Sequence, residues 1–193
     1  MGWFDFLFGP PDVATTWRER PGLELVLNLD RHTICELKLG DRADRISILG
    51  PPDNKKPTRA DTYLYASKGI ELCTGEDGIE TITAIFEPTD HWVMHGFEKK
   101  AAAYGGKIIY GGKPVALSRD TSEGEFVGRF GQPYWRDEDE YETTLFYEFG
   151  PLEWQVEFET GGGLRGLVLE SPPTMAQAEA RAAYQVDKAW PPG

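Results

Sequence analysis

The chain has few of the residues that most often form nucleophilic, redox or metal sites. Its 193 residues include three histidines and two cysteines, Cys35 and Cys73. The alternation expected around each cysteine places the two thiols on opposite faces, so a disulfide between them would be hard to close. Two unpaired thiols are typical of a reducing compartment, and we therefore expect a cytoplasmic protein.

Long apolar runs and an excess of basic charge are also missing. No stretch approaches the roughly 20 apolar residues of a membrane-spanning helix. Lys and Arg number 20 against 32 for Asp and Glu, which gives a net charge of −12. Because a polyanion is repelled by phosphates, we expect no nucleic-acid partner, whereas a basic protein partner fits this charge. A hydrophobic fraction of 40% predicts a folded chain with a core.

The common catalytic patterns are missing as well. Ser118, Ser122 and Ser171 lack the Gly-x-Ser-x-Gly setting of a nucleophile elbow. The glycine run at 161–163 is followed by Leu164, where a phosphate-binding loop would continue to Lys and then Ser or Thr. The sequence therefore predicts no catalytic residues, no cofactor and no enzymatic activity.

One histidine pair gives an alternative hypothesis of a metal-dependent enzyme. His91 and His95 are four residues apart, which on a helix places both imidazoles on one face, and Glu98 could be a third ligand. Trp92 stands where the metalloprotease signature has Glu. Because structural zinc sites use four protein ligands, we expect no bound metal here.

The first residues contain an aromatic cluster that precedes a Gly-Pro-Pro sequence. Its members are Trp3, Phe4, Phe6 and Phe8. One hypothesis is a short helix whose rings pack onto the domain. The alternative is a peripheral membrane protein, or a partner contact, in which these rings are the attachment. No basic residue precedes Arg18, which weakens attachment to anionic lipid.

The middle of the chain contains the same short patterns twice. The matching pairs are Gly50 and Gly131, Gly69 and Gly150, and, with a slip of one residue, Tyr65 and Tyr147. Both glycine pairs are 81 residues apart (131 − 50 = 81). A repeated pattern of this length predicts a repeated unit of fold, because each copy must bury its own apolar face.

We therefore expect an α+β fold made of two tandem copies, each an antiparallel β-sheet with a short helix packed on one face. The first copy covers residues 23–88 and the second covers residues 107–171. Residues 1–22 form an aromatic N-terminal segment, residues 89–106 a linking helix and residues 172–193 a C-terminal helix. The sequence leaves open whether the two copies share one sheet.

The expected elements of each copy follow from apolar alternation and from turn residues. In the first copy the strands are 23–29, 33–39, 62–66, 70–74 and 79–86, with a helix over 42–49. In the second copy the strands are 107–110, 114–117, 143–149, 152–158 and 164–169, with a helix that begins at Thr121 or Ser122 and reaches Phe130. An acidic loop is expected at 137–140.

The clearest strand is the one over residues 152–158. Its apolar face consists of Leu152, Trp154, Val156 and Phe158. Its polar face consists of Glu153, Gln155, Glu157 and Glu159. This alternation is typical of an antiparallel strand with one face buried and one face in water.

The order of motifs resembles a known domain. Each copy has a short helix, a Leu-Gly-x-Pro or Phe-Gly-x-Pro turn, an aromatic strand, an alternating strand and a final strand. This order resembles the SmpA/OmlA-type domain of outer-membrane assembly lipoproteins and is similar to the tandem domain of β-lactamase inhibitory proteins. The matching residues are Leu39, Gly40, Asp41, Ile46, Leu49 to Pro52, Tyr63, Tyr65, Ile70, Leu72, Asp77, Gly78 and Ile82, and then Thr121, Val127, Phe130 to Pro133, Tyr147, Trp154 and Leu167.

The resemblance implies a protein-binding module without catalysis, such as an inhibitor or an immunity protein. It also implies binding through the exposed sheet face, which makes Glu153, Gln155, Glu157 and Glu159 candidates by position. The chain departs from the family pattern in two ways, which limit how far the family's properties apply to it. No lipobox cysteine stands near the N-terminus, and each copy opens with a β-hairpin that the helix-first pattern lacks.

Overall fold

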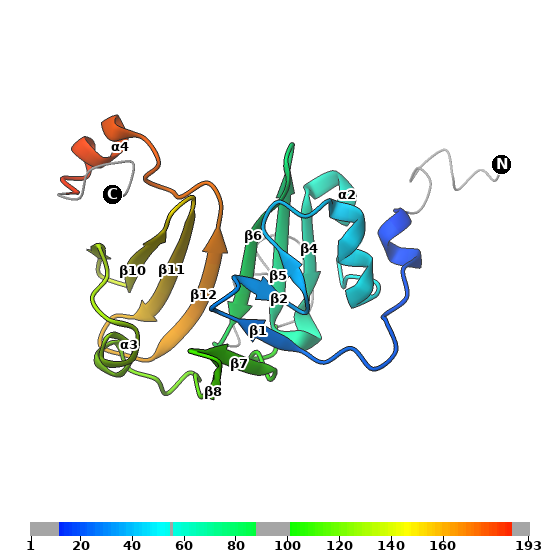
Figure 1. The fold of residues 1–193 in the computed structure, drawn as a ribbon, viewed down its shortest axis with the longest axis horizontal. Helices are drawn as coiled ribbons and strands as arrows, with labels where there is room; N and C mark the ends of the chain where they lie inside the picture. Colours follow the sequence, from blue (N-terminus) through cyan, green and yellow to red (C-terminus); the bar gives the residue numbers. More distant parts are fainter. Residues whose placement is uncertain (1–11, 55, 88–100, 187–193) are drawn as a thin grey trace.

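The computed structural model describes residues 12–54, 56–87 and 101–186, which form two β-sheets and a few short helices (Figure 1). The predicted α+β class is confirmed. The smaller sheet has the strand order β3-β2-β1-β7-β8 and the larger has the order β4-β5-β6-β12-β11-β10-β9. The smaller sheet is formed by β1 (Val26–Asn28), β2 (Thr33–Ile34), β3 (Leu37–Lys38), β7 (Lys107–Tyr110) and β8 (Lys113–Val115).

The larger sheet takes its strands from both halves of the chain. They are β4 (Thr62–Tyr65), β5 (Ile70–Gly75), β6 (Gly78–Ile85), β9 (Trp135–Glu138), β10 (Glu142–Phe149), β11 (Leu152–Glu159) and β12 (Leu164–Glu170). The helices are the 3-10 helices η1 (Val13–Thr16), η2 (Ala43–Leu49) and η3 (Ala66–Lys68), and the α-helices α2 (Pro57–Ala60), α3 (Glu123–Phe130) and α4 (Ala178–Ala183).

The two halves are joined through both sheets. In the larger sheet, β6 pairs antiparallel with β12, and Ile82 lies opposite Leu169. In the smaller sheet, β1 pairs parallel with β7, and Leu27 lies opposite Ile108. The question that the sequence left open therefore has a clear answer, since residues 62–85 and 135–170 share one continuous sheet.

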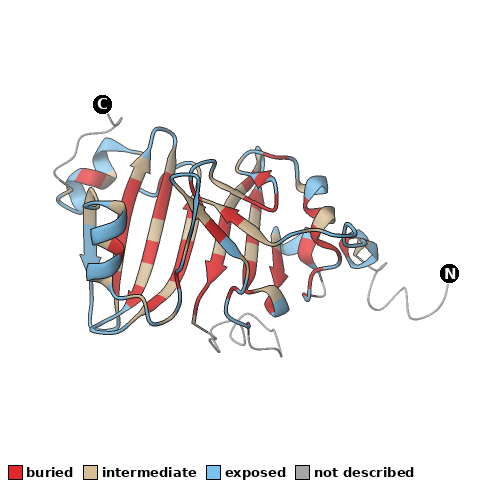
Figure 2. Cartoon of the chain, turned by 60° about the horizontal axis from the view of Figure 1, so that its bottom comes forward, coloured by how far each residue is buried: buried red, intermediate tan, exposed pale blue. Residues whose placement is uncertain are grey.

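The main core lies against one face of the larger sheet, where the smaller sheet and α3 also contribute apolar side chains. The predicted apolar face of β11 is confirmed, because Trp154, Val156 and Phe158 are at most 1% exposed. Buried and half-buried residues alternate along the central strands (Figure 2). Phe126 of α3 is fully buried and its ring lies 5.9 Å from those of Tyr147 and Phe158.

The helix of the second half begins where the sequence indicates. The Ser122 hydroxyl accepts a hydrogen bond from the Glu125 backbone nitrogen, and the Glu125 carboxylate accepts one from the Ser122 nitrogen. This reciprocal pair is a capping box, which satisfies two backbone donors at the start of α3. The expected helix of the first half is a 3-10 helix, Ala43–Leu49, and it ends at Gly50 as predicted.

The strand expected over 33–39 is interrupted by a tight turn. β2 and β3 pair with each other, and Cys35 and Glu36 between them have φ values of 49° and 73°. Two consecutive left-handed residues form the kind of turn that fits a two-residue hairpin, although neither is a usual turn residue there. Cys35 therefore lies in a turn, and not on one face of a continuous strand with Leu37 and Leu39 as expected. Cys35 and Cys73 are both free thiols.

The two long flanking helices are not found in the described residues. Only α4 is helical between 172 and 186. It ends at Ala183, and Gln185 has a φ of 56°. Residues 187–193 of the predicted C-terminal helix lie outside the described residues. Residues 101–106 contain no helix, since Ala102 and Tyr104 donate backbone hydrogen bonds to Ala66 and Ile85. The rest of the predicted linking helix, 89–100, lies outside the described residues.

Candidate functional site

The polar face predicted on β11 is partly buried. Glu153 is 0% exposed, and its carboxylate accepts hydrogen bonds from the Tyr134 hydroxyl at 2.6 Å and the Thr174 backbone nitrogen at 3.2 Å. Gln155 is half-buried and donates its amide hydrogens to Glu153 and Glu170. The expectation of solvent exposure is therefore wrong for Glu153, because residues of the segment 172–186 contact this face.

Arg181 anchors that C-terminal segment. Its side chain is 3% exposed and pairs with the Glu148 carboxylate of β10, whose side chain is fully buried. The Arg181 Nε donates a hydrogen bond to the Met175 carbonyl oxygen at 2.7 Å. Its guanidinium also lies 5.0 Å from the centre of the Tyr134 ring. The positive charge of Arg181 on α4 is thus compensated by the carboxylate of Glu148 on β10, and this pair holds the C-terminal segment against the larger sheet.

Glu157 and Glu159 occupy different environments. The Glu157 Oε2 lies 3.1 Å from the position that a β-carbon on Gly166 would take, so this carboxylate covers a glycine of β12. The pKa of Glu157 is raised, because burial and the neighbouring Glu142 outweigh the opposing effect of Arg165. Glu159 is exposed and pairs with Arg119. The four predicted residues therefore do not form one solvent-facing surface.

An ion-pair network joins the two halves beside Glu157. Arg165 donates hydrogen bonds to Glu87 at 3.1 Å and to Glu142 at 2.9 Å. Arg119 lies 3.1 Å from Glu87 and also pairs with Glu159. The two arginines are neutralised by these carboxylates, so this region presents no free cationic site.

In the described part of the first half, the carboxylate of Glu71 has a strongly shifted titration. Burial raises the pKa of Glu71 on β5 to about 7. The Cys73 thiol lies 3.8 Å from the Glu71 carboxylate and 3.7 Å from the Thr62 hydroxyl. Burial also raises the pKa of this thiol, which keeps it protonated and a poor nucleophile. Within the described ranges, no group of three His, Cys, Asp or Glu residues is arranged to hold a metal ion.

A groove of about 430 Å³ lies beside β1 and β2. Its charged lining residues include Arg20 and Glu36, which form an ion pair at 3.0 Å. Cys35 also lines the groove, and burial raises the pKa of its thiol. The paired charges and the protonated thiol of Cys35 therefore supply no activated nucleophile.

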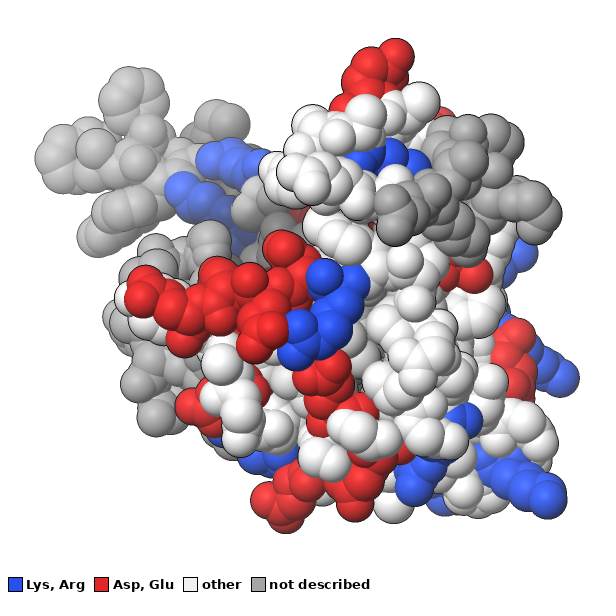
Figure 3. Space-filling model, turned by 90° about the vertical axis from the view of Figure 1, so that its left-hand side faces the viewer, with Lys and Arg blue, Asp and Glu red and all other residues white. Residues whose placement is uncertain are grey.

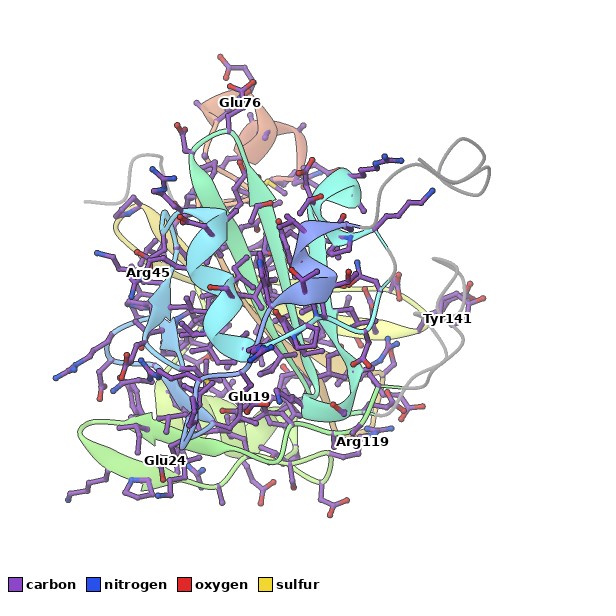
Figure 4. All side chains as sticks on the ribbon, turned by 90° about the vertical axis from the view of Figure 1, so that its right-hand side faces the viewer. Glu19, Glu24, Arg45, Glu76, Arg119 and Tyr141 are labelled. Atoms are coloured by element: carbon purple, nitrogen blue, oxygen red, sulfur yellow. The ribbon has the colours of Figure 1, made fainter. Side chains whose placement is uncertain are left out.

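Within the described residues, four consecutive exposed carboxylates lie at the end of the β9–β10 hairpin. We call residues 137–141 the acidic tip. It consists of Asp137, Glu138, Asp139, Glu140 and Tyr141, all of them exposed. Tyr141 is 70% exposed and lies at the periphery of the molecule (Figure 4). Acidic side chains gather around a few basic ones on the end of the molecule that carries β10, α3 and α4 (Figure 3).

The acidic tip is an ordered turn. The Asp139 carboxylate accepts hydrogen bonds from the backbone nitrogens of Tyr141 at 2.7 Å and Glu142 at 2.9 Å. These two bonds lower the pKa of Asp139. The Asp139 nitrogen donates in turn to the Glu142 carbonyl oxygen at 3.0 Å. The charges at 137 and 140 are therefore held on a fixed backbone. The sequence predicted the acidic residues here as a loop, whereas 137 and 138 belong to strand β9.

Arg136, which precedes the acidic tip in the sequence, is already paired. Arg136 donates hydrogen bonds to Glu123 of α3 at 2.8 and 3.1 Å and to Glu138 at 2.5 Å. On the other face of β9, Trp135 stacks on Phe146 with ring centres 4.4 Å apart. Arg136 thus fixes β9 to α3, and the Trp135 ring packs on the neighbouring strand β10. Among the described residues, no cation pairs with Asp137, Asp139 or Glu140.

Two groups of predicted residues cannot be placed. The aromatic cluster Trp3, Phe4, Phe6 and Phe8 lies outside the described residues, as do His91, His95 and Glu98. In the described ranges, no helix is long and apolar enough to cross a membrane.

In comparisons with known proteins, no family model matches the chain, and no curated protein or solved structure matches it significantly.

Proposed function

We propose that this chain is a non-enzymatic protein-binding module whose partner presents a basic surface to the acidic tip. The observation that carries the proposal is the exposure of four consecutive carboxylates on a hairpin end that is closed by hydrogen bonds to Asp139. A rigid charged surface steers an oppositely charged protein without ordering a loop first, which favours fast association. This replaces the β11 face as the binding surface, because Glu153 on that face is buried.

We also infer that the chain arose by duplication of one unit, in keeping with a resemblance to tandem inhibitory proteins. The backbone at the two helix ends supports this inference. Gly50 follows the helix of the first half with φ 86° and ψ −164°, and Gly131 follows the helix of the second half with φ 89° and ψ −177°. Such φ values favour glycine at both positions. At the offset of 81, residues 137–141 correspond to 56–60 (137 − 81 = 56, 141 − 81 = 60), most of which form α2 in the first half, so the acidic tip belongs to the second copy alone.

Two double variants test the binding proposal. Asp137→Lys with Glu140→Lys reverses two charges of the acidic tip, and it spares Asp139, which forms the turn. Glu76→Lys with Asp77→Lys is the matched control, because both residues are exposed at the end of the β5–β6 hairpin (Figure 4). The two double variants change the net charge by the same amount.

The measurement is affinity capture from the lysate of the native host, with bound proteins quantified by mass spectrometry. We expect one stoichiometric protein that binds the unsubstituted chain and the Glu76/Asp77 variant and is lost with the Asp137/Glu140 variant. Equal capture by all three, or capture of no stoichiometric protein by any, would contradict the proposal.

A further inference from the structure

We propose that the partner binds by adding an extended basic segment to the free edge of β9. This inference rests on the proposed function, because it specifies how a basic partner would engage the acidic tip. It depends on two observations, the direction of the backbone groups of β9 and the difference between the two edges of the larger sheet.

The direction of the β9 backbone follows from the ladder register. The Asp139 nitrogen donates to the Glu142 carbonyl oxygen, so the backbone N–H of Asp139 points towards β10. Inward-pointing residues alternate along an antiparallel ladder, so Asp137, opposite Thr144, also directs its backbone groups towards β10. The N–H and C=O groups of Arg136 and Glu138 therefore point away from β10.

Among the described residues, no strand pairs with this outer edge, since β9 ends the larger sheet. The opposite edge, β4, is already occupied. The Asn54 side chain accepts a hydrogen bond from the Leu64 nitrogen at 3.0 Å and donates one to the Thr62 carbonyl oxygen at 2.7 Å. Asn54 is 4% exposed, so it closes β4 as a neighbouring strand would. β9 is the edge left available for strand addition.

Charge selects the occupant of this edge. The side chains along it include five carboxylates, at Glu123, Asp137, Glu138, Asp139 and Glu140, against one basic group at Arg136. A second copy of the chain paired through β9 would bring two such sets together, and like charges across a strand pair are destabilising. An extended segment with Lys or Arg at alternate positions would instead place its cations beside these carboxylates.

Side chains of an added strand would reach both faces of β9. Arg136 and Glu138 project towards α3, where Arg136 contacts Glu123. Asp137 alternates to the other face, on which Trp135 stacks with Phe146. Basic side chains on one face of the partner segment would approach Glu123 and Glu138, while neighbouring residues would lie near Asp137 and Trp135.

The test uses a defined probe, an acetylated eight-residue peptide of alternating Lys and Thr. A second peptide has the same sequence and charge, but three consecutive central amides are N-methylated, which removes the donors that strand pairing needs. Binding is measured at low ionic strength, together with hydrogen exchange of the Arg136 and Glu138 amides in the full chain. We expect the first peptide to slow exchange at both amides and to bind at least tenfold more tightly than the methylated peptide.

Two substitutions at one position test the same edge from the protein side. Glu138→Pro removes the outward N–H and the charge, whereas Glu138→Gln removes the charge alone. We expect Glu138→Pro to bind the peptide about tenfold more weakly than Glu138→Gln, the loss of about one hydrogen bond. If Glu138→Pro fails to fold, the methylated peptide still gives the answer with the unsubstituted chain.

The outcomes separate this inference from the proposed function. Equal binding of the two peptides without slowed exchange would overturn strand addition and leave a basic partner at the acidic tip in place. Peptide binding that is unchanged by the Asp137/Glu140 reversal would contradict the acidic tip itself. A dimer of the protein alone that Glu138→Pro dissociates would make a second copy the occupant and overturn the inference.

Discussion

The Tyr147 hydroxyl donates a hydrogen bond to the Gly131 carbonyl oxygen at 3.0 Å. In the first half, the Tyr65 hydroxyl donates to the Gly50 carbonyl oxygen at the same distance. Each bond ties the residue that ends a helix to a strand of the larger sheet. The glycines are 81 residues apart and the tyrosines 82 (147 − 65 = 82), which is the slip of one residue seen in the sequence.

These two bonds predict matched effects of removing either hydroxyl. Tyr147→Phe and Tyr65→Phe should each lower the free energy of unfolding by about 1 kcal/mol, because each leaves a carbonyl oxygen without its donor. Tyr184→Phe is the control, since that side chain is 61% exposed and should change stability by less than about 0.5 kcal/mol. Urea unfolding followed by fluorescence measures all three. A loss at only one of the two buried positions would argue against equivalent roles.

The buried pair of Arg181 and Glu148 predicts a large cost for removing one partner. Arg181→Met should destabilise the protein by about 3 kcal/mol or more, because it leaves a carboxylate buried without its counter-charge. The double variant Arg181→Met with Glu148→Gln should recover part of that loss. Thermal unfolding of the single and double variants provides the comparison. If the double variant is as unstable as the single one, the ion pair does not explain the cost.

The raised pKa of Glu71 predicts a pH-dependent stability of unusual sign. Its pKa is about 7 in the folded protein against an ordinary value of 4.5, so folding favours the protonated form. The contribution is fully present below the ordinary value and is lost as the pH rises through about 7. Stability should therefore fall between pH 4.5 and 7 by an amount of up to about 3 kcal/mol.

Glu71→Gln isolates this contribution, because the amide cannot ionise. The difference in the free energy of unfolding between the unsubstituted chain and Glu71→Gln should change across that pH range. Urea midpoints measured at half-unit pH steps give this difference. A flat difference for Glu71→Gln would show that this carboxyl titrates normally in the folded protein.

Much of the fold follows from local patterns in the sequence. The alternation from Leu152 to Phe158 predicted both the strand and its buried face, and Ser122 with Glu125 marked the start of α3. These features are carried by neighbouring residues, so a single sequence reveals them. The turn at Cys35 and Glu36 was not predicted, because neither residue is typical of left-handed backbone.

The candidate site depended on contacts that a sequence does not display. Glu153 is covered by Tyr134 and Thr174, which come from elements before and after its own strand. A sequence signal for that cover is Arg181, a basic residue within an alanine-rich stretch. The charges of the acidic tip are visible in the sequence. Their position beside an edge strand is not, because it depends on β9 pairing with β10 and with no other described strand.

The measurement that tests the central claim most directly is the association rate constant of the captured partner at low and high salt. At low salt, the Asp137→Lys and Glu140→Lys variant should associate at least about tenfold more slowly than the unsubstituted chain and should show a weaker salt dependence. The Glu76→Lys and Asp77→Lys variant should stay within about twofold of the unsubstituted chain, since only the acidic tip faces the partner. If both variants associate equally slowly, the net charge of the protein explains the effect and the acidic tip does not. If the Asp137/Glu140 variant associates as fast as the unsubstituted chain, binding at the acidic tip is contradicted.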